Sequence, residues 1–190
     1  MTTTIQSLRK HPQLHSLFKE AESRFLNEEE LEFYLAEYPE GSAPAKASGE
    51  IKAIANQITK KVITRIYEIY PFESNHELAM PKCTRDVRYV IAYATLAMLM
   101  QDIDWFRDKL LIWMKTIIQS FGYPDIAKGE KPYFEDTEVV EHLGTLKSHQ
   151  KSIYETYYAI REEMRSNLSE EAYNEIEPYI TVALDVLAHD

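Results

Sequence analysis

A short polar segment of the chain, Lys82-Cys83-Thr84-Arg85-Asp86, gathers a thiol, two cations and a carboxylate within about one turn of a helix. Cys83 and Asp86 are three residues apart, so a helix places both side chains on one face. A nearby helix N-terminus and the cations Lys82, Arg85 and Arg88 would favour the thiolate, the nucleophilic form of cysteine. The pattern is compatible with a reactive thiol beside a carboxylate, but spacing alone favours a structural cysteine, a small buried apolar residue, as unpaired cysteines often are.

Histidine and tyrosine supply the other candidate groups. Only His76 is close to Cys83 in sequence, so a cysteine–histidine nucleophile pair is not indicated. His142 and His149 could share a helical face toward haem iron or a metal, although exposed histidine is the commoner explanation. A cluster of three tyrosines consists of Tyr154, Tyr157 and Tyr158. These rings could pack on a planar ligand, or they could belong to the core or to an interface.

Composition and motifs exclude several classes of protein. The 190 residues carry a formal charge of −10, which repels phosphate backbones, so we expect no nucleic-acid partner. A single cysteine rules out an internal disulfide and fits a reducing, cytoplasmic setting. The longest apolar run, 89–100, falls short of the roughly 20 residues that span a bilayer. The chain has no serine elbow, phosphate loop or dinucleotide fingerprint, and we expect neither an enzyme nor a metal site.

Apolar spacing predicts an all-α protein of seven or eight helices without strands. The first two helices are expected over 11–24 and 28–38, and they meet at a sharp corner. Asn27 and, three residues later, Glu30 form a typical N-capping arrangement for the second of these helices.

The central part of the chain predicts the longest helices. The segment 39–44 holds two prolines and a glycine and predicts a loop, and helix resumes after Ser48. Residues 51–69 then keep one apolar face until Pro71. The stretch 71–81 is expected to be irregular. The next helix, 82–101, is the most apolar and should lie in the core.

The C-terminal half predicts three more helices. Asp102 is a typical cap for the first. Residues 136–165 predict one helix of about 45 Å, unless Gly144 breaks it, and that helix either packs on its neighbours or forms a dimeric coiled coil. The last helix is expected to start at Ser169 and to bend at Pro178.

The motif Lys82-Cys83-x-Arg85-Asp86-x-x-Tyr89 resembles the chromophore-attachment helix of the phycobiliproteins, the globin-like antenna subunits of cyanobacteria. Three other segments are similar to parts of that family. They are 21–26 before the capped helix, 63–72 at the end of the next long helix, and the corner at 121–124. The resemblance covers roughly 15–150 and, more weakly, the final helix.

This resemblance implies an all-α, globin-like helical bundle of the phycobiliprotein type with an N-terminal helical hairpin extension. We expect one domain over 1–190, with the hairpin at 11–38 and the globin core at 48–190. The implied ligand is an open-chain tetrapyrrole, or bilin, bound covalently or non-covalently. A ligand-free state is the alternative.

The resemblance also implies the bilin-binding residues, which are Cys83, Arg85, Asp86, Lys82 and Tyr89. The Cys83 thiolate could form a thioether with the ring A substituent. Asp86 could accept hydrogen bonds from pyrrole N–H groups, and Arg85 and Lys82 could pair with propionates.

Several positions depart from the antenna pattern. Val90 stands where the family has a second aromatic residue. Ala92 replaces an arginine that normally meets an acidic residue of the partner's hairpin. The segment 98–102 replaces a small Ala-Gly-Asp turn. These departures resemble the divergent branch of bilin-biosynthesis-associated globins.

We therefore expect a non-catalytic protein associated with bilin biosynthesis or handling in a cyanobacterium-like organism. The expected partners are a second copy, bound through the N-terminal helices, and phycobiliproteins or bilin-pathway proteins. The expected location is the cytoplasm, including the cytoplasmic face of thylakoids. One alternative is an antenna or photosensory subunit with pigment thioether-linked to Cys83, and another is a ligand-free helical interaction module.

Overall fold

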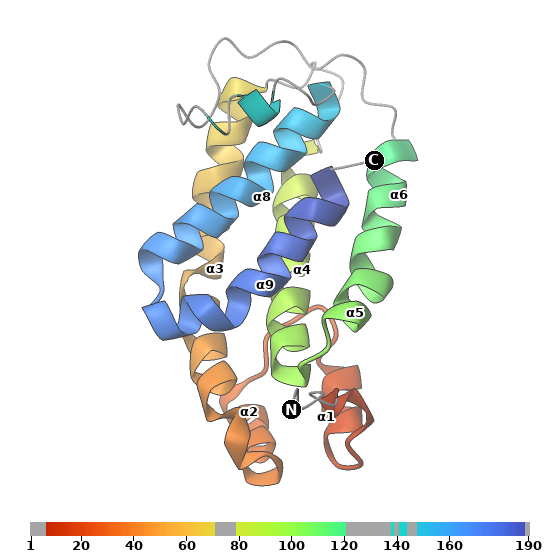
Figure 1. Ribbon diagram of the computed structural model, residues 1–190, viewed down its shortest axis with the longest axis vertical. Coiled ribbons are helices and arrows are strands. Elements are labelled where there is room, and N and C mark those ends of the chain that lie inside the picture. The colour runs from red at the N-terminus through yellow and green to blue at the C-terminus, as the bar shows by residue number, and fades with distance from the viewer. Residues whose placement is uncertain (1–6, 71–78, 121–137, 139–140, 144–147, 189–190) are drawn as a thin grey trace.

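The computed structural model describes residues 7–70, 79–120, 138, 141–143 and 148–188. Within these ranges every regular element is a helix and none is a strand, which confirms the predicted all-α class (Figure 1). None of the helices in this part of the chain combines the length and apolar character needed to cross a bilayer.

The N-terminal helices α1 (Leu14–Glu20) and α2 (Glu28–Glu37) lie at one end of the bundle (Figure 1). The predicted cap of α2 is confirmed. The Asn27 side chain accepts from the Glu30 backbone N–H at 2.9 Å, and the Glu30 carboxylate accepts from the Asn27 N–H at 2.8 Å. Arg24 donates two further hydrogen bonds to Glu30, at 2.7 and 2.6 Å, and these bonds lower the pKa of that carboxyl.

Replacing Asn27 by alanine is expected to lower the free energy of unfolding by about 1 kcal/mol, because the Glu30 N–H loses its acceptor. Chemical denaturation of the variant measures the loss. Asn174→Ala is the matched control, because Asn174 is exposed inside a helix, where alanine is the better helix former. Equal stability of Asn27→Ala and the wild type would contradict a role for the cap.

The long helix α3 (Ser42–Ile69) begins earlier than the sequence predicted. The loop expected over 39–44 is wrong, because Pro39–Gly41 form a short 3-10 turn and the helix starts at Ser42 rather than after Ser48. Pro44 lies in the first turn, where a backbone N–H has no partner inside the helix, so proline costs little there. The predicted apolar face is confirmed, and α3 ends at Ile69.

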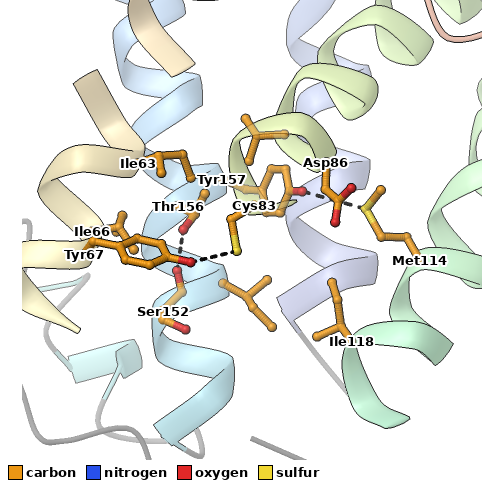
Figure 2. Close-up of a pocket in the computed structure, with 12 residues that line it drawn as sticks. Ile63, Ile66, Tyr67, Cys83, Asp86, Met114, Ile118, Ser152, Thr156 and Tyr157 are labelled. Carbon is orange, nitrogen blue, oxygen red and sulfur yellow. Dashed lines mark hydrogen bonds between the residues drawn. The ribbon is translucent and has the colours of Figure 1, made fainter. Parts of the chain in front are cut away.

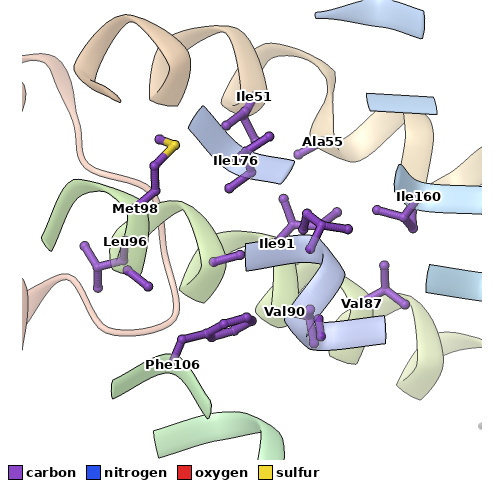
Figure 3. Packing of buried hydrophobic residues seen from close by; sticks show 14 of the residues in the cluster. Ile51, Ala55, Val87, Val90, Ile91, Leu96, Met98, Phe106, Ile160 and Ile176 are labelled. Atoms are coloured by element: carbon purple, nitrogen blue, oxygen red, sulfur yellow. The ribbon is translucent and has the colours of Figure 1, made fainter. Parts of the chain in front are cut away.

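Helix α4 (Ala79–Met100) is the core helix, as predicted. It begins within the stretch 71–81 that was expected to be irregular. Pro81 again occupies the first turn, and 71–78 lies outside the described residues. Figure 3 shows α4 residues packed between side chains from α3 and the C-terminal helices. Those labelled from α4 are Val87, Val90, Ile91, Leu96 and Met98.

Two local features end α4 and start the next helix. Gln101 has a left-handed φ of 54° and closes the helix with hydrogen bonds from Gln101 N to Met98 O and from Asp102 N to Ala97 O. A glycine is usual there, but the Gln101 amide donates to the Tyr38 hydroxyl at 3.2 Å. The predicted Asp102 cap is confirmed, since its carboxylate accepts from Trp105 N at 2.8 Å.

The helix expected after Asp102 is divided into three parts. These are α5 (Ile103–Phe106), a π-helical turn (Arg107–Leu111) and α6 (Ile112–Ser120). The π turn widens the helix by one residue per turn, so apolar spacing alone did not predict it.

The C-terminal helices α8 (Ser148–Asn167) and α9 (Glu170–Ala188) run antiparallel and pack across α3 and α4 (Figure 1). The long helix predicted over 136–165 is only partly tested, because 139–140 and 144–147 lie outside the described residues. The expected start at Ser169 is confirmed, as its hydroxyl accepts from Ala172 N at 3.3 Å. Pro178 lies inside α9.

Candidate functional site

A partly open cavity of about 80 Å³ lies between α3, α4, α6 and α8 (Figure 2). Its wall is apolar on one part and polar on another. The apolar residues are Ile63, Ile66, Val87, Met114, Ile118 and Ile153. The polar ones are Tyr67, Cys83, Asp86, Ser152, Thr156 and Tyr157. The cavity therefore offers an apolar slot with hydrogen-bonding groups beside a thiol.

Cys83 lies in the second turn of α4 and lines this cavity. The Tyr67 hydroxyl on α3 donates a hydrogen bond to its sulfur at 3.3 Å. Burial raises the pKa of the thiol, and the hydrogen bond from Tyr67 acts in the opposite direction. The sequence predicted a favoured thiolate because Cys83 was expected in the first turn, but the helix starts at Ala79 and burial outweighs the nearby cations.

Asp86 also lines the cavity, one turn along the same face of α4. Arg85 binds its Oδ1 through Nε at 2.8 Å and Nη2 at 2.7 Å. Both side chains are partly in water, with 56% of Arg85 and 37% of Asp86 exposed, so the pair adds little stability. Arg85 reaches the cavity only through Asp86.

The phycobilisome protein family model matches residues 18–128, more than half of the chain and the whole of α4. The chain belongs to the phycobilisome protein family. The match confirms the resemblance drawn from the Lys82 to Tyr89 motif and the globin-like, all-α fold class. No curated protein shows a significant match to the chain.

In this phycobilisome family member the five candidate residues form two groups. Cys83 and Asp86 line the cavity. Lys82, Arg85 and Tyr89 are exposed and do not line it, and the Tyr89 ring lies 5.9 Å from the Arg85 guanidinium. The motif therefore supplies one wall of the cavity and a short polar strip on the surface beside it.

The positions that depart from the antenna pattern are part of the family member's core. Val90 and Ala92 are 0% and 3% exposed, and Met98 is 2% exposed. Because Ala92 is buried and uncharged, this position offers no ion pair to a partner's hairpin.

The sequence did not single out most of the cavity residues on other helices. Tyr67 comes from α3, Met114 from α6, and Ser152 and Thr156 from α8. The only available signal was the spacing of Ser152 and Thr156, two polar residues four apart on a face that is otherwise apolar. Both are more than nine-tenths buried.

The three residues of the tyrosine cluster all lie on α8, but only one of them faces the cavity. Tyr157 is buried and lines the cavity, where its hydroxyl lies 4.0 Å from the sulfur of Met114. Tyr154 and Tyr158 do not line the cavity, and their rings stack on each other with a centroid distance of 5.8 Å. The ring of His142 lies 4.6 Å from that of Tyr154.

Among the described residues, no three His, Cys, Asp or Glu side chains lie close enough to hold an ion. The side chain of His149 lies outside the described residues, so its predicted pairing with His142 remains a prediction.

Proposed function

We propose that this member of the phycobilisome protein family is a non-catalytic bilin-handling protein that supports the biosynthesis or delivery of linear tetrapyrroles. The observation that carries the proposal is the cavity, because it places the Cys83 thiol and the Asp86 carboxylate on one wall within the segment that the family match covers. Asp86 would accept hydrogen bonds from pyrrole N–H groups, and Cys83 would face the end ring.

The size of the cavity favours handling over light harvesting. An engineered protein cavity of about 150 Å³ holds a single benzene molecule. The cavity beside Cys83 has about 80 Å³, roughly half of that volume, and is partly open, so at most one ring of a four-ring pigment could enter it. The other rings would lie outside, where another protein can take up the pigment. An antenna pigment, in contrast, must be held rigidly along its length to avoid losing excitation as heat.

The surface around the cavity suits the outer part of such a ligand. Lys82 and Arg85 are exposed cations on the turn of α4 that carries Cys83, and cations pair well with propionate groups. Arg85 would exchange its bond to Asp86 for one to a propionate. Tyr89 offers an exposed ring on the same helix.

A covalently pigmented antenna or photosensory subunit is the second candidate function. One observation favours it, namely that Cys83 lines the cavity and is not sealed in the core. Under both candidates we propose a cytoplasmic protein that pairs with a second copy through its N-terminal helices, where Phe33 on α2 is an exposed aromatic residue.

Coexpression of the full chain with a bilin-producing pathway tests these functions. For a handling protein we expect pigment absorbance in the purified native protein and no zinc-enhanced fluorescence on a denaturing gel. Cys83→Ala should then keep part of the native absorbance, and Thr84→Ala, in the same turn but outside the cavity, should keep all of it.

The other outcomes point to the rival functions. A fluorescent gel band that vanishes in Cys83→Ala supports the covalently pigmented subunit. A native protein that carries no pigment contradicts both bilin functions and leaves the ligand-free interaction module.

A further inference from the structure

Two helices meet at the sulfur of Cys83. The Tyr67 hydroxyl from α3 donates to Sγ of Cys83 on α4 at 3.3 Å, and Figure 2 shows the two side chains pointing toward each other at the cavity wall. Both residues line the cavity. The hydrogen bond therefore connects the thiol to a neighbouring helix and restricts the rotation of the half-buried Cys83 side chain.

The described titratable groups around this sulfur come from α3, α4 and α8. Asp86 and Arg85 belong to α4, Tyr157 lies on α8, and α6 contributes only side chains that do not titrate. Burial raises the pKa of the thiol, the Tyr67 hydrogen bond lowers it, and the smaller effects of Asp86 and Arg85 have opposite signs. Arg85 is bound to Asp86, so their charges largely cancel. Tyr67 is thus the main group that favours the thiolate.

We propose that Tyr67 is a positioning residue for Cys83, which aims the sulfur into the cavity and stabilises the thiolate for addition to an electron-poor carbon–carbon double bond of the ligand. In this addition the sulfur–carbon bond forms as the π bond breaks. The proton from the thiol ends on the neighbouring carbon, so the step needs no oxidant or reductant. Additions of thiols to conjugated double bonds are reversible, so this adduct would persist only while the folded protein holds the ligand and would be lost on a denaturing gel, as the proposed handling function requires.

The inference rests on the proposed function for the identity of the ligand, but the reactivity of the thiol can be measured without a pigment. Cys83 is the only cysteine, so every thiol adduct of the chain reports on this site. Acrylamide carries an electron-poor double bond and is a suitable probe. The rate of Cys83 alkylation is measured by mass spectrometry as a function of pH for the wild type and Tyr67→Phe, which removes only the hydroxyl.

Loss of the hydroxyl should move the midpoint of the rate profile to higher pH. For a shift of about one pH unit, the fraction of thiolate below the midpoint falls about tenfold. Each thiolate becomes roughly threefold more nucleophilic, because its basicity rises. The alkylation rate below the midpoint therefore falls about threefold. Above the midpoint both proteins are fully ionised, and Tyr67→Phe should react about threefold faster. The two profiles should therefore cross.

Tyr93→Phe is the matched control, because Tyr93 is also half-buried but stacks on Trp105 at 5.6 Å and does not line the cavity. Its profile should equal that of the wild type. An unchanged profile in Tyr67→Phe would overturn the inference. A rate altered by the same factor at every pH would also overturn it, since that result reports only a change in access.

The two proposals can fail separately. If the profiles cross but the native protein takes up no bilin, the role of Tyr67 stands and the proposed function is wrong. If the protein carries bilin and the profiles coincide, the proposed function stands and the role of Tyr67 is wrong.

Discussion

Replacing Tyr34 by alanine is expected to lower the free energy of unfolding by about 3–5 kcal/mol. Tyr34 is fully buried, and its ring packs edge-on against Phe18 at 6.1 Å and Tyr38 at 6.0 Å. Its hydroxyl donates to the Leu99 carbonyl at 3.1 Å. The substitution therefore removes a large apolar volume and leaves a buried acceptor at the end of α4 without its donor. Equilibrium denaturation measures the loss.

Gly41 provides a second test of the packing around Tyr34. A Cβ atom at Gly41 would overlap the Tyr34 hydroxyl oxygen and lie 2.6 Å from two ring carbons, and Tyr34 is fully buried against Phe18 and Tyr38, which leaves its ring little room to move. Gly41→Ala should cost about 1–3 kcal/mol in the wild type but almost nothing when Tyr34 is already alanine. The double-mutant cycle should thus show strong coupling.

Gly49→Ala is the control for this cycle. A Cβ there meets nothing within 4 Å, and Gly49 lies inside α3, so alanine should stabilise the protein by about 0.5–1 kcal/mol. Additive losses for Gly41→Ala and Tyr34→Ala would contradict the close packing of Gly41 against Tyr34. The contact matters for function because it anchors α2, the surface proposed for pairing, to the bundle.

Elements defined by local chemistry could be predicted from the sequence. The capping interactions at Asn27 and Asp102 involve neighbours three residues away, so the sequence contains all of their parts. The apolar face of α3 and the burial of α4 follow from spacing alone. Each of these features depends on a few adjacent residues.

The errors occurred where proline was treated as a helix breaker. Pro44 and Pro81 both lie in the first turn of a helix, and proline interrupts a helix only when its missing N–H would have been used. The start of a helix can be set by tertiary packing upstream of the proline, as with the buried Gly41 beside Tyr34. Spacing carries no information on such contacts.

The candidate site was also predicted only where short-range spacing determines it. Cys83 and Asp86 were placed on one face correctly, because their separation of three residues determines it. Tyr67 and Thr156 join them from α3 and α8, and no short-range pattern reports which helices become neighbours. The state of the thiol was also misjudged, since its pKa depends on burial by those helices.

Filling the cavity is expected to weaken pigment binding strongly without unfolding the protein. Thr156 is 7% exposed and lines the cavity next to Cys83. In Thr156→Phe the new ring would occupy the space that the proposed function assigns to one pigment ring. Burial of one such ring contributes roughly 2 kcal/mol, so the variant should bind bilin about thirtyfold more weakly. Absorbance titration of the purified chain with free bilin measures the affinity.

Thr156→Val separates the loss of space from the loss of the hydroxyl. The Thr156 hydroxyl donates to the Ser152 carbonyl in its own helix at 2.6 Å, so removing it leaves the cavity open and should change the affinity less than threefold. Ile118→Phe fills the same cavity from α6, so it controls for the possibility that Thr156→Phe acts only by distorting α8. Because the added rings occupy existing space, the thermal midpoints should stay at or above the wild-type value. Wild-type affinity in both filled variants would show that bilin binds elsewhere, and the cavity would then have no part in handling the pigment.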